Sequence, residues 1–188
     1  NMQERKRLLS FLRKNDERRE RVGSLSVTCP IKPRKGEVVR FWRDSPSHVG
    51  AYTYAVDIIT PDPRVNALVV YSPVSGTVTQ IIQDHEEFGN GPQFNDKLNF
   101  LTILLEDGVT FVQLCHIGKD SAVNDTGEPL KVGDEVKENT PIAKTGANGW
   151  MTDPRHIHIM AGRLDNTKPD GFYSIPIHFT DAPDPYKV

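Results

Sequence analysis

The sequence predicts a mainly β fold, an antiparallel β-sandwich or open barrel preceded by one N-terminal helix. After Gly23, short runs rich in β-branched and aromatic residues alternate with turns of Gly, Pro, Asn and Asp, and no long helical pattern returns. Helical spacing of apolar residues is confined to residues 2–21. We therefore expect a charged helix over 1–22, one β domain over 23–180 and a tail over 181–188.

The N-terminal segment combines a short apolar stripe with an excess of positive charge. The stripe consists of Leu8, Leu9, Phe11 and Leu12. Eight basic residues outnumber four acidic ones in this segment, although the whole chain carries a net charge of -2. A basic helix that meets an anionic surface or partner would show this pattern, and so would a solvated helix whose stripe packs on the domain. We favour the second interpretation, and the stripe is too short for a signal peptide.

Ten runs after Gly23 have the composition of strands. They cover 25–30, 37–41, 54–59, 66–71, 76–82, 99–106, 109–117, 141–145, 156–162 and 174–179. Two turns between them have recognisable chemistry: Glu106-Asp107-Gly108 predicts a hairpin, and Val132-Gly133-Asp134 predicts a second tight turn. The polar stretch 85–96 predicts a long, mobile loop.

Composition argues against a nucleic-acid partner and a membrane span, and the first two residues bear on the compartment. The net charge of -2 provides no polycation for nucleic acid, and no apolar run approaches the ~18 residues that span a bilayer. Cys29 and Cys115 cannot form a disulfide framework or a CxxC zinc finger, and two reduced, partly buried thiols are favoured over a single bridge. Asn1 before Met2 indicates a cloning remnant. We expect the cell envelope or secretion if a leader has been removed, and the cytoplasm if Met2 is the native start.

The run "PRHIHIM" (154–160) places two histidines one residue apart among apolar neighbours. Side chains alternate across a strand, so His156, His158 and Met160 share one face while Ile157 and Ile159 take the other. A pocket that requires two imidazole rings would show this pattern. A strand whose polar face is simply in contact with water would show it as well.

Asp57 is a carboxylate inside the apolar run 54–59. Because burial of an unpaired carboxylate is very costly, Asp57 requires a cation, a metal ion or several hydrogen-bond donors. Backbone amides or the hydroxyl of Thr53 are the simpler partners. A catalytic zinc ion would be suited by two histidines, one aspartate and an open fourth position. His48, ahead of this run, is one candidate for such a histidine.

Three further histidines have different expected environments. His116 ends the run 109–117, where alternation predicts that it shares a face with Val112 and Leu114. His85 lies in the charged stretch 85–96, and we expect it to be exposed. His178 could line a groove, but we favour a strand residue that faces solvent.

Five segments occur in an order that resembles the lysostaphin-like (LytM-type) zinc metallopeptidases. They are "SHVGAYTYAVDIITP", "VYSPVSGTVTQII", "VTFVQLCHIG", "LKVGDEVKENTPIAKTGANG" and "RHIHIM". A closing "SIPIHF" is similar to a strand that follows the domain in some members, and the resemblance covers roughly residues 38–180. The resemblance implies an antiparallel β-sheet with a substrate groove. It also implies a zinc-dependent endopeptidase that cuts bacterial cell-wall (peptidoglycan) peptides.

The resemblance also implies a role for each histidine of the site. His48, Asp57 and His158 match the ligands of one zinc ion, and His116 and His156 match the two histidines that flank the metal-bound water. We expect His156 to be the general base and His116 to stabilise the oxyanion or position the water, although the two roles could be exchanged. No HExxH motif is present, so that other zinc-protease arrangement is excluded.

The sequence departs from the family pattern at the first ligand. Many members have a histidine four residues before the aspartate, where this chain has Thr53, and His48 lies nine residues before Asp57. We expect His48 rather than Thr53 to supply the ligand. If His48 did not reach, only Asp57 and His158 would remain and zinc would bind poorly.

Two alternative functions from other classes remain. One is a catalytically silent domain of the same fold that binds a wall peptide or a protein partner. The other is a swinging-arm carrier, because "SPVSGTV" and "VGDEVKENTPI" also resemble lipoyl or biotinyl half-domains. A carrier requires a lysine at a hairpin tip between the halves, and no Met-Lys-Met or Asp-Lys-Ala tip is present.

Overall fold

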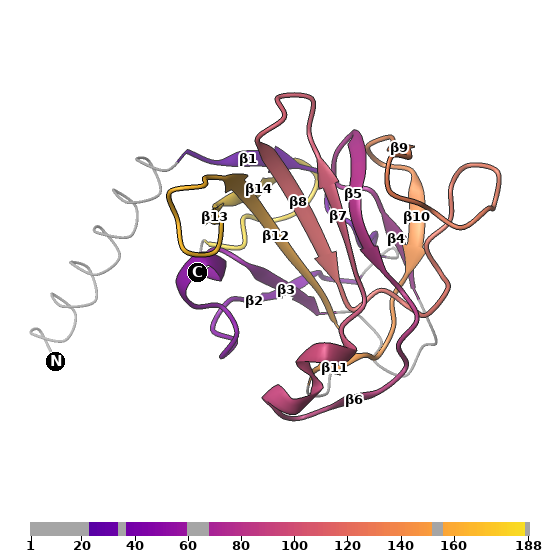
Figure 1. The fold of residues 1–188 in the computed structure, drawn as a ribbon, viewed down its shortest axis with the longest axis horizontal. Coiled ribbons are helices and arrows are strands. Elements are labelled where there is room, and N and C mark those ends of the chain that lie inside the picture. The colour runs from indigo at the N-terminus through magenta and orange to yellow at the C-terminus, as the bar shows by residue number, and fades with distance from the viewer. Residues whose placement is uncertain (1–22, 34–36, 60–67, 152–155, 187–188) are drawn as a thin grey trace, which may run out of the picture.

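A computed structural model of the chain describes residues 23–33, 37–59, 68–151 and 156–186 (Figure 1). The predicted N-terminal helix over 1–22 lies outside these residues. Within them the protein is mainly β, as predicted, and its helical segments are the short 3₁₀ turns η1 (Gly50–Tyr52) and η2 (Pro92–Lys97). No helix in this part of the chain is long and apolar enough to cross a membrane.

The largest sheet is antiparallel throughout. Its strands are β2 (Arg40–Trp42), β3 (Val56–Ile59), β5 (Gly76–Ile82), β7 (Phe100–Leu104), β8 (Thr110–Cys115), β9 (Glu135–Val136), β12 (His156–Leu164) and β13 (Phe172–Ile175). They follow the order β2-β3-β12-β8-β7-β5-β9, and β13 pairs with the second half of β12. The strands do not close into a barrel within the described residues, which leaves the predicted open architecture.

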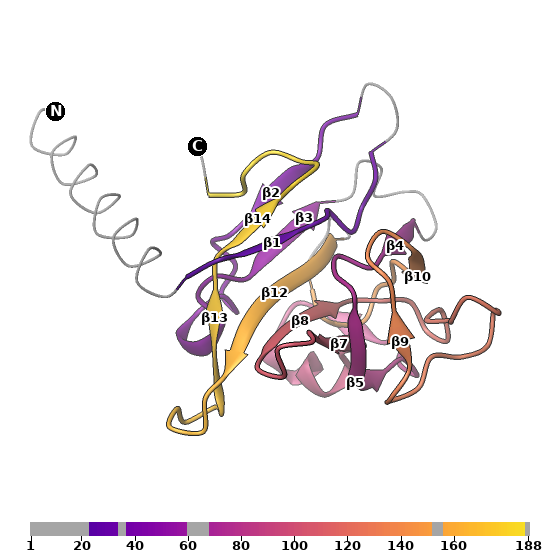
Figure 2. The same cartoon turned by 90° about the horizontal axis from the view of Figure 1, so that it is seen from above.

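Three two-stranded sheets accompany the large one. β4 (Val69–Tyr71) and β10 (Pro141–Lys144) are antiparallel, whereas β1 (Leu25–Val27) with β14 (Ile177–Phe179) and β6 (Phe88–Gly89) with β11 (Gly149–Trp150) are parallel. The two parallel pairs depart from the antiparallel pairing predicted for the whole domain. Figure 2 shows β1, β14, β2 and β3 toward one side of the molecule, β4, β5, β9 and β10 toward the other, and β12, β8 and β7 between them.

One face of the large sheet is buried and the other is open. On β12, Ile157 and Ile159 are fully buried in the main core, together with side chains from β1, β14, β4 and β10. His158 and Met160 line a groove on the opposite face. The alternation predicted for residues 156–160 is therefore confirmed, and the histidines lie on the groove side because the isoleucines occupy the core.

Each of the ten predicted runs overlaps a strand, and the last of them overlaps two. β13 ends at Ile175 and β14 begins at Ile177 in a different sheet, because Pro176 between them has no N–H for a ladder. β6, β9 and β11 were not predicted, because two-residue strands are too short to show a period. The stretch 85–96 is not simply a loop: it contains β6 and most of η2.

Both predicted turns are confirmed. In the β7–β8 hairpin, the Leu105 amide donates to the Thr110 carbonyl at 2.8 Å, and the Asp107 carboxylate accepts the amides of Val109 and Thr110 at 3.0 and 2.8 Å. Gly133 has φ +99°, a left-handed conformation that glycine adopts without strain. Both cysteines are free thiols, as predicted, and both are fully rather than partly buried.

Candidate metal site and groove

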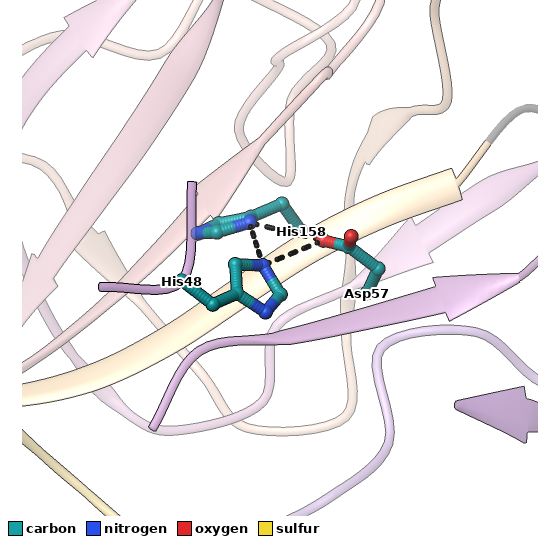
Figure 3. A group of neighbouring side chains, drawn as sticks. All are labelled: His48, Asp57 and His158. Carbon is teal, nitrogen blue, oxygen red and sulfur yellow. Dashed lines mark hydrogen bonds and ion pairs between the residues drawn. The ribbon is translucent and has the colours of Figure 1, made fainter. Parts of the chain in front are cut away.

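Three side chains from different parts of the chain meet at the open face of the sheet (Figure 3). His48 lies in the loop before η1, Asp57 lies on β3, and His158 lies on β12 directly opposite Asp57. His48 Nε2 lies 3.2 Å from Asp57 Oδ1 and 3.1 Å from His158 Nδ1. His158 Nδ1 lies 3.0 Å from Asp57 Oδ1. The β3–β12 register thus places two of the three groups, and the loop adds the third.

The three atoms that meet in this cluster have more lone pairs than protons, so the cluster can bind a cation. His48 Nδ1 lies 2.8 Å from the Arg43 carbonyl, which only accepts, so Nδ1 carries the proton and Nε2 has a lone pair. The Asp57 oxygen also only accepts, and His158 Nδ1 carries at most one proton into the three contacts. Two imidazole nitrogens and a carboxylate oxygen with more lone pairs than protons fit a divalent cation such as Zn²⁺.

Asp57 is buried and ionised. Burial alone would raise its pKa, but the close contacts with His158 and His48 outweigh burial and hold the pKa well below its usual range. Thr53 is not its partner: it is exposed, and its hydroxyl donates to the Gly50 carbonyl at 2.6 Å. Capping of Asp57 by Thr53 is therefore wrong, and within the described residues the side chains that contact its carboxylate are histidines.

Two further histidines lie beside the cluster. His156 Nε2 lies 3.8 Å from Asp57 Oδ1, and its ring meets that of His116 edge to face, with centroids 4.6 Å apart and an interplanar angle of 72°. All five predicted site residues are thus brought together around one carboxylate. His48, Asp57 and His158 make the direct contacts, while His116 and His156 form a neighbouring pair.

His116 does not lie on the face predicted for it. Val112 and Leu114 are fully buried in the core, whereas His116 lines the groove with Cys115. The reason is the backbone of His116, which has φ +65° and breaks the alternation of β8 where the strand ends. Regular strand geometry would have directed this imidazole into the apolar core.

Hydrogen bonds hold His116 in this unusual conformation. Its amide donates to the Asn99 carbonyl at 2.9 Å, and its carbonyl accepts the Gly146 amide at 2.8 Å. Its Nδ1 donates to the Asn148 carbonyl at 2.8 Å, so Nε2 is the acceptor nitrogen. Burial, reinforced by the nearby His156, lowers the pKa of His116 to about 3, and the ring is neutral near pH 7.

Two buried asparagines that sequence reasoning missed support this loop. The Asn99 amide donates to Asn148 Oδ1 at 2.9 Å, and both side chains donate to the Ile117 carbonyl. Asn99 also pairs with the backbone of His85 in both directions, at 3.0 and 2.9 Å. A buried Asn has no marker in a single sequence, because its partners here are main-chain groups from distant segments.

The remaining histidines lie outside the groove. His178 is exposed on β14 and faces Asp184, with Nδ1 3.7 Å from Oδ2, which confirms the predicted orientation toward solvent. The exposure predicted for His85 is wrong in degree, because the residue is half-buried and its Nε2 lies 3.5 Å from Asp84 Oδ1. Neither residue reaches the cluster.

The groove passes on both sides of the site. A pocket of about 970 Å³ covers the floor formed by β5, β7, β8 and β12, and an adjoining pocket of about 360 Å³ lies against β3 and the start of β12. The residues that line both pockets are Pro46, Ser47, His116, Trp150 and His158. An elongated ligand that fills both pockets would therefore pass over the histidine cluster.

Comparison with known proteins identifies the fold. No protein-family model and no curated protein match the sequence. Among solved structures, the M23 metalloprotease pseudoalterin, from the deep sea, has a TM-score of 0.54 at 12% identity, with 85% of this chain and 79% of that chain covered. A putative glycyl-glycine endopeptidase LytM from Ruminococcus gnavus has a TM-score of 0.52 at 15% identity, with 80% of this chain and 55% of that chain covered.

The chain therefore has the lysostaphin-like M23 peptidase fold, as its five sequence segments implied. It spans about half the length of the Ruminococcus protein. Because one fold can support different activities, function has to be argued from the site itself.

Proposed function

We propose that the chain is a zinc-dependent endopeptidase that hydrolyses peptides of bacterial peptidoglycan. The observation that carries the proposal is the contact of His48 Nε2, Asp57 Oδ1 and His158 Nδ1 within 3.2 Å of one another, at the junction of two groove pockets. Two nitrogens, one carboxylate oxygen and an open position are the donor set of catalytic zinc sites.

His48, Asp57 and His158 would hold the ion. The Arg43 carbonyl orients the His48 ring by accepting from Nδ1, and such second contacts fix the tautomer of metal-binding histidines. A zinc ion held there would lower the pKa of a bound water molecule and polarise the scissile carbonyl.

His116 and His156 would move and hold protons. Because Nδ1 of His116 is occupied by the Asn148 carbonyl, its Nε2 presents a lone pair that accepts a hydrogen bond from water. This geometry favours water positioning by His116 over donation to an oxyanion. His156, half-buried beside the cluster and 3.8 Å from Asp57, is the proposed general base.

The groove and the structural neighbours support a peptide substrate. A cleft of about 970 Å³ and an adjoining pocket of about 360 Å³, which share five lining residues, leave room for an extended chain that passes the site. The neighbour from Ruminococcus gnavus is described as a putative glycyl-glycine endopeptidase. Peptides with consecutive glycines are therefore the first substrates to test.

Elemental analysis and a cleavage assay test the proposal together. Protein purified without chelator should contain close to one zinc per chain and should release soluble fragments from peptidoglycan sacculi or cleave glycine-rich or D-alanyl peptides. Chelation should abolish cleavage, and zinc should restore it. Zinc far below one per chain, unchanged after zinc addition, would contradict the metal site. Full occupancy without cleavage of any of these substrates would instead identify a silent binding domain.

A further inference from the structure

A row of polar side chains crosses the floor of the groove beside the candidate metal site. Gln80 on β5, Thr102 on β7 and Gln113 on β8 lie directly opposite one another across adjacent strands. Gln113 Nε2 donates to Thr102 Oγ1 at 3.1 Å, and Thr102 Oγ1 donates to Gln80 Oε1 at 3.1 Å. We call these three residues the Gln row.

The rows on either side of the Gln row are mainly apolar. Toward the metal site, the neighbouring row contains Phe100 and Cys115 and reaches His158, and the row on the other side contains Leu104 and Phe111. Successive rows on one face of a sheet are about 7 Å apart, which is the length of about two extended residues. The Gln row is thus a polar stripe about two peptide residues from the row that contains His158.

A β-bulge brings Gln80 into this stripe. The β5–β7 register shifts between Val78 and Gln80, so Thr79 is an extra residue. Val78 is fully buried in the core, and strict alternation would place Gln80 on that same face. With the bulge, Gln80 lines the groove and Ile81 packs against the core instead. The bulge avoids burial of an amide in the core and directs that amide into the groove.

Each hydrogen bond of the row is donated toward Gln80, and the Gln80 side-chain amide is the last group in the row. The Cys115 thiol donates to Gln113 Oε1 at 3.7 Å, and the bonds continue through Thr102 to Gln80 Oε1. This sequence orients the Gln80 amide with Oε1 toward Thr102 and Nε2 away from it. Gln80 is exposed, and its Nε2 makes no hydrogen bond within the part of the chain that the structure describes. Two N–H donors therefore face the groove.

We propose that the Gln row is a substrate subsite in which Gln80 Nε2 donates to a main-chain carbonyl of an extended peptide, about two residues from the bond to be cleaved. A peptide carbonyl only accepts, and it matches donors that lie on the floor between two apolar rows. The subsite rests on the proposed peptidase function, which it deepens by assigning the residues that hold the peptide main chain. Binding there excludes water from the row and fixes the register of the peptide along the groove.

A substitution of Gln80 by Glu separates recognition from structure. Gln80→Glu keeps an oxygen that accepts from Thr102 but removes both N–H donors. Gln93→Glu, on the exposed side of η2 and outside the groove, adds the same charge as a matched control. The probe is acetyl-pentaglycine amide, because no side chain keeps its main chain away from the floor. Binding is measured by NMR titration in a His156→Ala background, in which turnover is slow.

The expected result is a shift of the Gln80 Nε2–H₂ resonances, assigned by their disappearance in Gln80→Glu, as the peptide binds. Gln80→Glu should weaken binding about three- to tenfold, the loss expected for one hydrogen bond, and Gln93→Glu should not. Equal affinity of Gln80→Glu and the background protein, or no shift of these resonances, would overturn the subsite. Because cleavage by the wild-type protein is measured separately, a subsite that binds without cleavage would overturn only the peptidase function.

Discussion

At the scale of single residues, the histidines of the site differ in which ring nitrogen faces it. His48 and His116 each donate from Nδ1 to a backbone carbonyl, at 2.8 Å in both cases, and so present Nε2 to the site. His158 faces the cluster with Nδ1 instead. Backbone carbonyls thus fix two tautomers before any ligand arrives, which lowers the cost of assembling the site.

Substitutions within the run 156–158 should separate metal binding from proton transfer. His158→Ala removes a ligand, so zinc and peptide cleavage should both be lost. His156→Ala leaves the three convergent ligand atoms in place, so zinc should stay bound while the cleavage rate falls by about 10²–10⁴. Zinc content by elemental analysis and cleavage by fragment release check both outcomes.

The exposed His178, on β14 and outside the groove, is the control for these substitutions, and His178→Ala should change neither zinc content nor rate. If His156→Ala lost zinc while His158→Ala kept it, the assignment of the two histidines would be reversed.

Removal of the Asn99 side chain should destabilise the fold. The residue is fully buried, and Asn99→Ala would leave the His85 amide and the His85 and Ile117 carbonyls without this partner. We expect the free energy of unfolding to fall by about 1–3 kcal/mol, measured by urea denaturation. The exposed Asn95 on η2 is the control, and Asn95→Ala should change the value by less than about 0.5 kcal/mol. Equal effects of the two substitutions would contradict the role assigned to Asn99.

At the scale of elements, β12 links the fold to the site. It pairs with β3, β8 and β13, and its register sets His158 opposite both Asp57 and Cys115. The strand therefore positions the candidate ligands through backbone pairing. The loop that contains His48 only has to reach a site that two strands have already formed.

Gly162 on β12 leaves no room for a larger residue unless a neighbouring side chain moves. A Cβ at this position would lie 2.5 Å from Cζ of Phe111, whose ring packs edge to face on Phe172 with centroids 5.5 Å apart. Gly162→Ala should lower the free energy of unfolding by about 1–3 kcal/mol, because the ring has to move toward the groove. Thermal unfolding checks this, with the exposed Arg163→Ala as control. A Gly162→Ala protein as stable as the wild type would show that the ring moves without cost.

The sequence predicted the strands more completely than the details of the site. Alternation located β12 and its two faces, because long strands show their period clearly. The same rule failed at His116, where a positive φ changes the phase, and a β-bulge changes the phase in the same way at Gln80, for which no face was predicted. Such irregularities leave no periodic signal. The ligand set His48, Asp57 and His158 came from the family resemblance, since nothing in nine-residue spacing indicates that a loop histidine reaches a strand aspartate.

At the scale of the whole molecule, one core carries both the groove and the small sheets. Val27 on β1 and Ile177 on β14 share a hydrophobic cluster with Leu114 on β8 and Ile159 on β12. Asp181, just after β14, accepts the Cys29 amide at 2.7 Å and pairs with Lys32. These contacts hold the segments near both ends of the domain against the core beneath the groove. Removal of either segment should therefore destabilise the site as well.

Alkaline pH should destabilise the whole molecule through its buried thiols. Burial raises the pKa of Cys29 from 9.0 to about 11, so the thiol ionises first in the unfolded chain. Between these two values the folded state binds more protons than the unfolded state, and stability falls as pH rises. The contribution of the Cys29 thiol to stability is fully retained below pH ~9. By pH ~11 its ionisation alone should lower the free energy of unfolding by about 2–3 kcal/mol. Urea denaturation at a series of pH values measures the loss, and Cys29→Ala, although less stable at neutral pH, should show a smaller alkaline decline. An identical decline in both proteins would assign the effect to other groups.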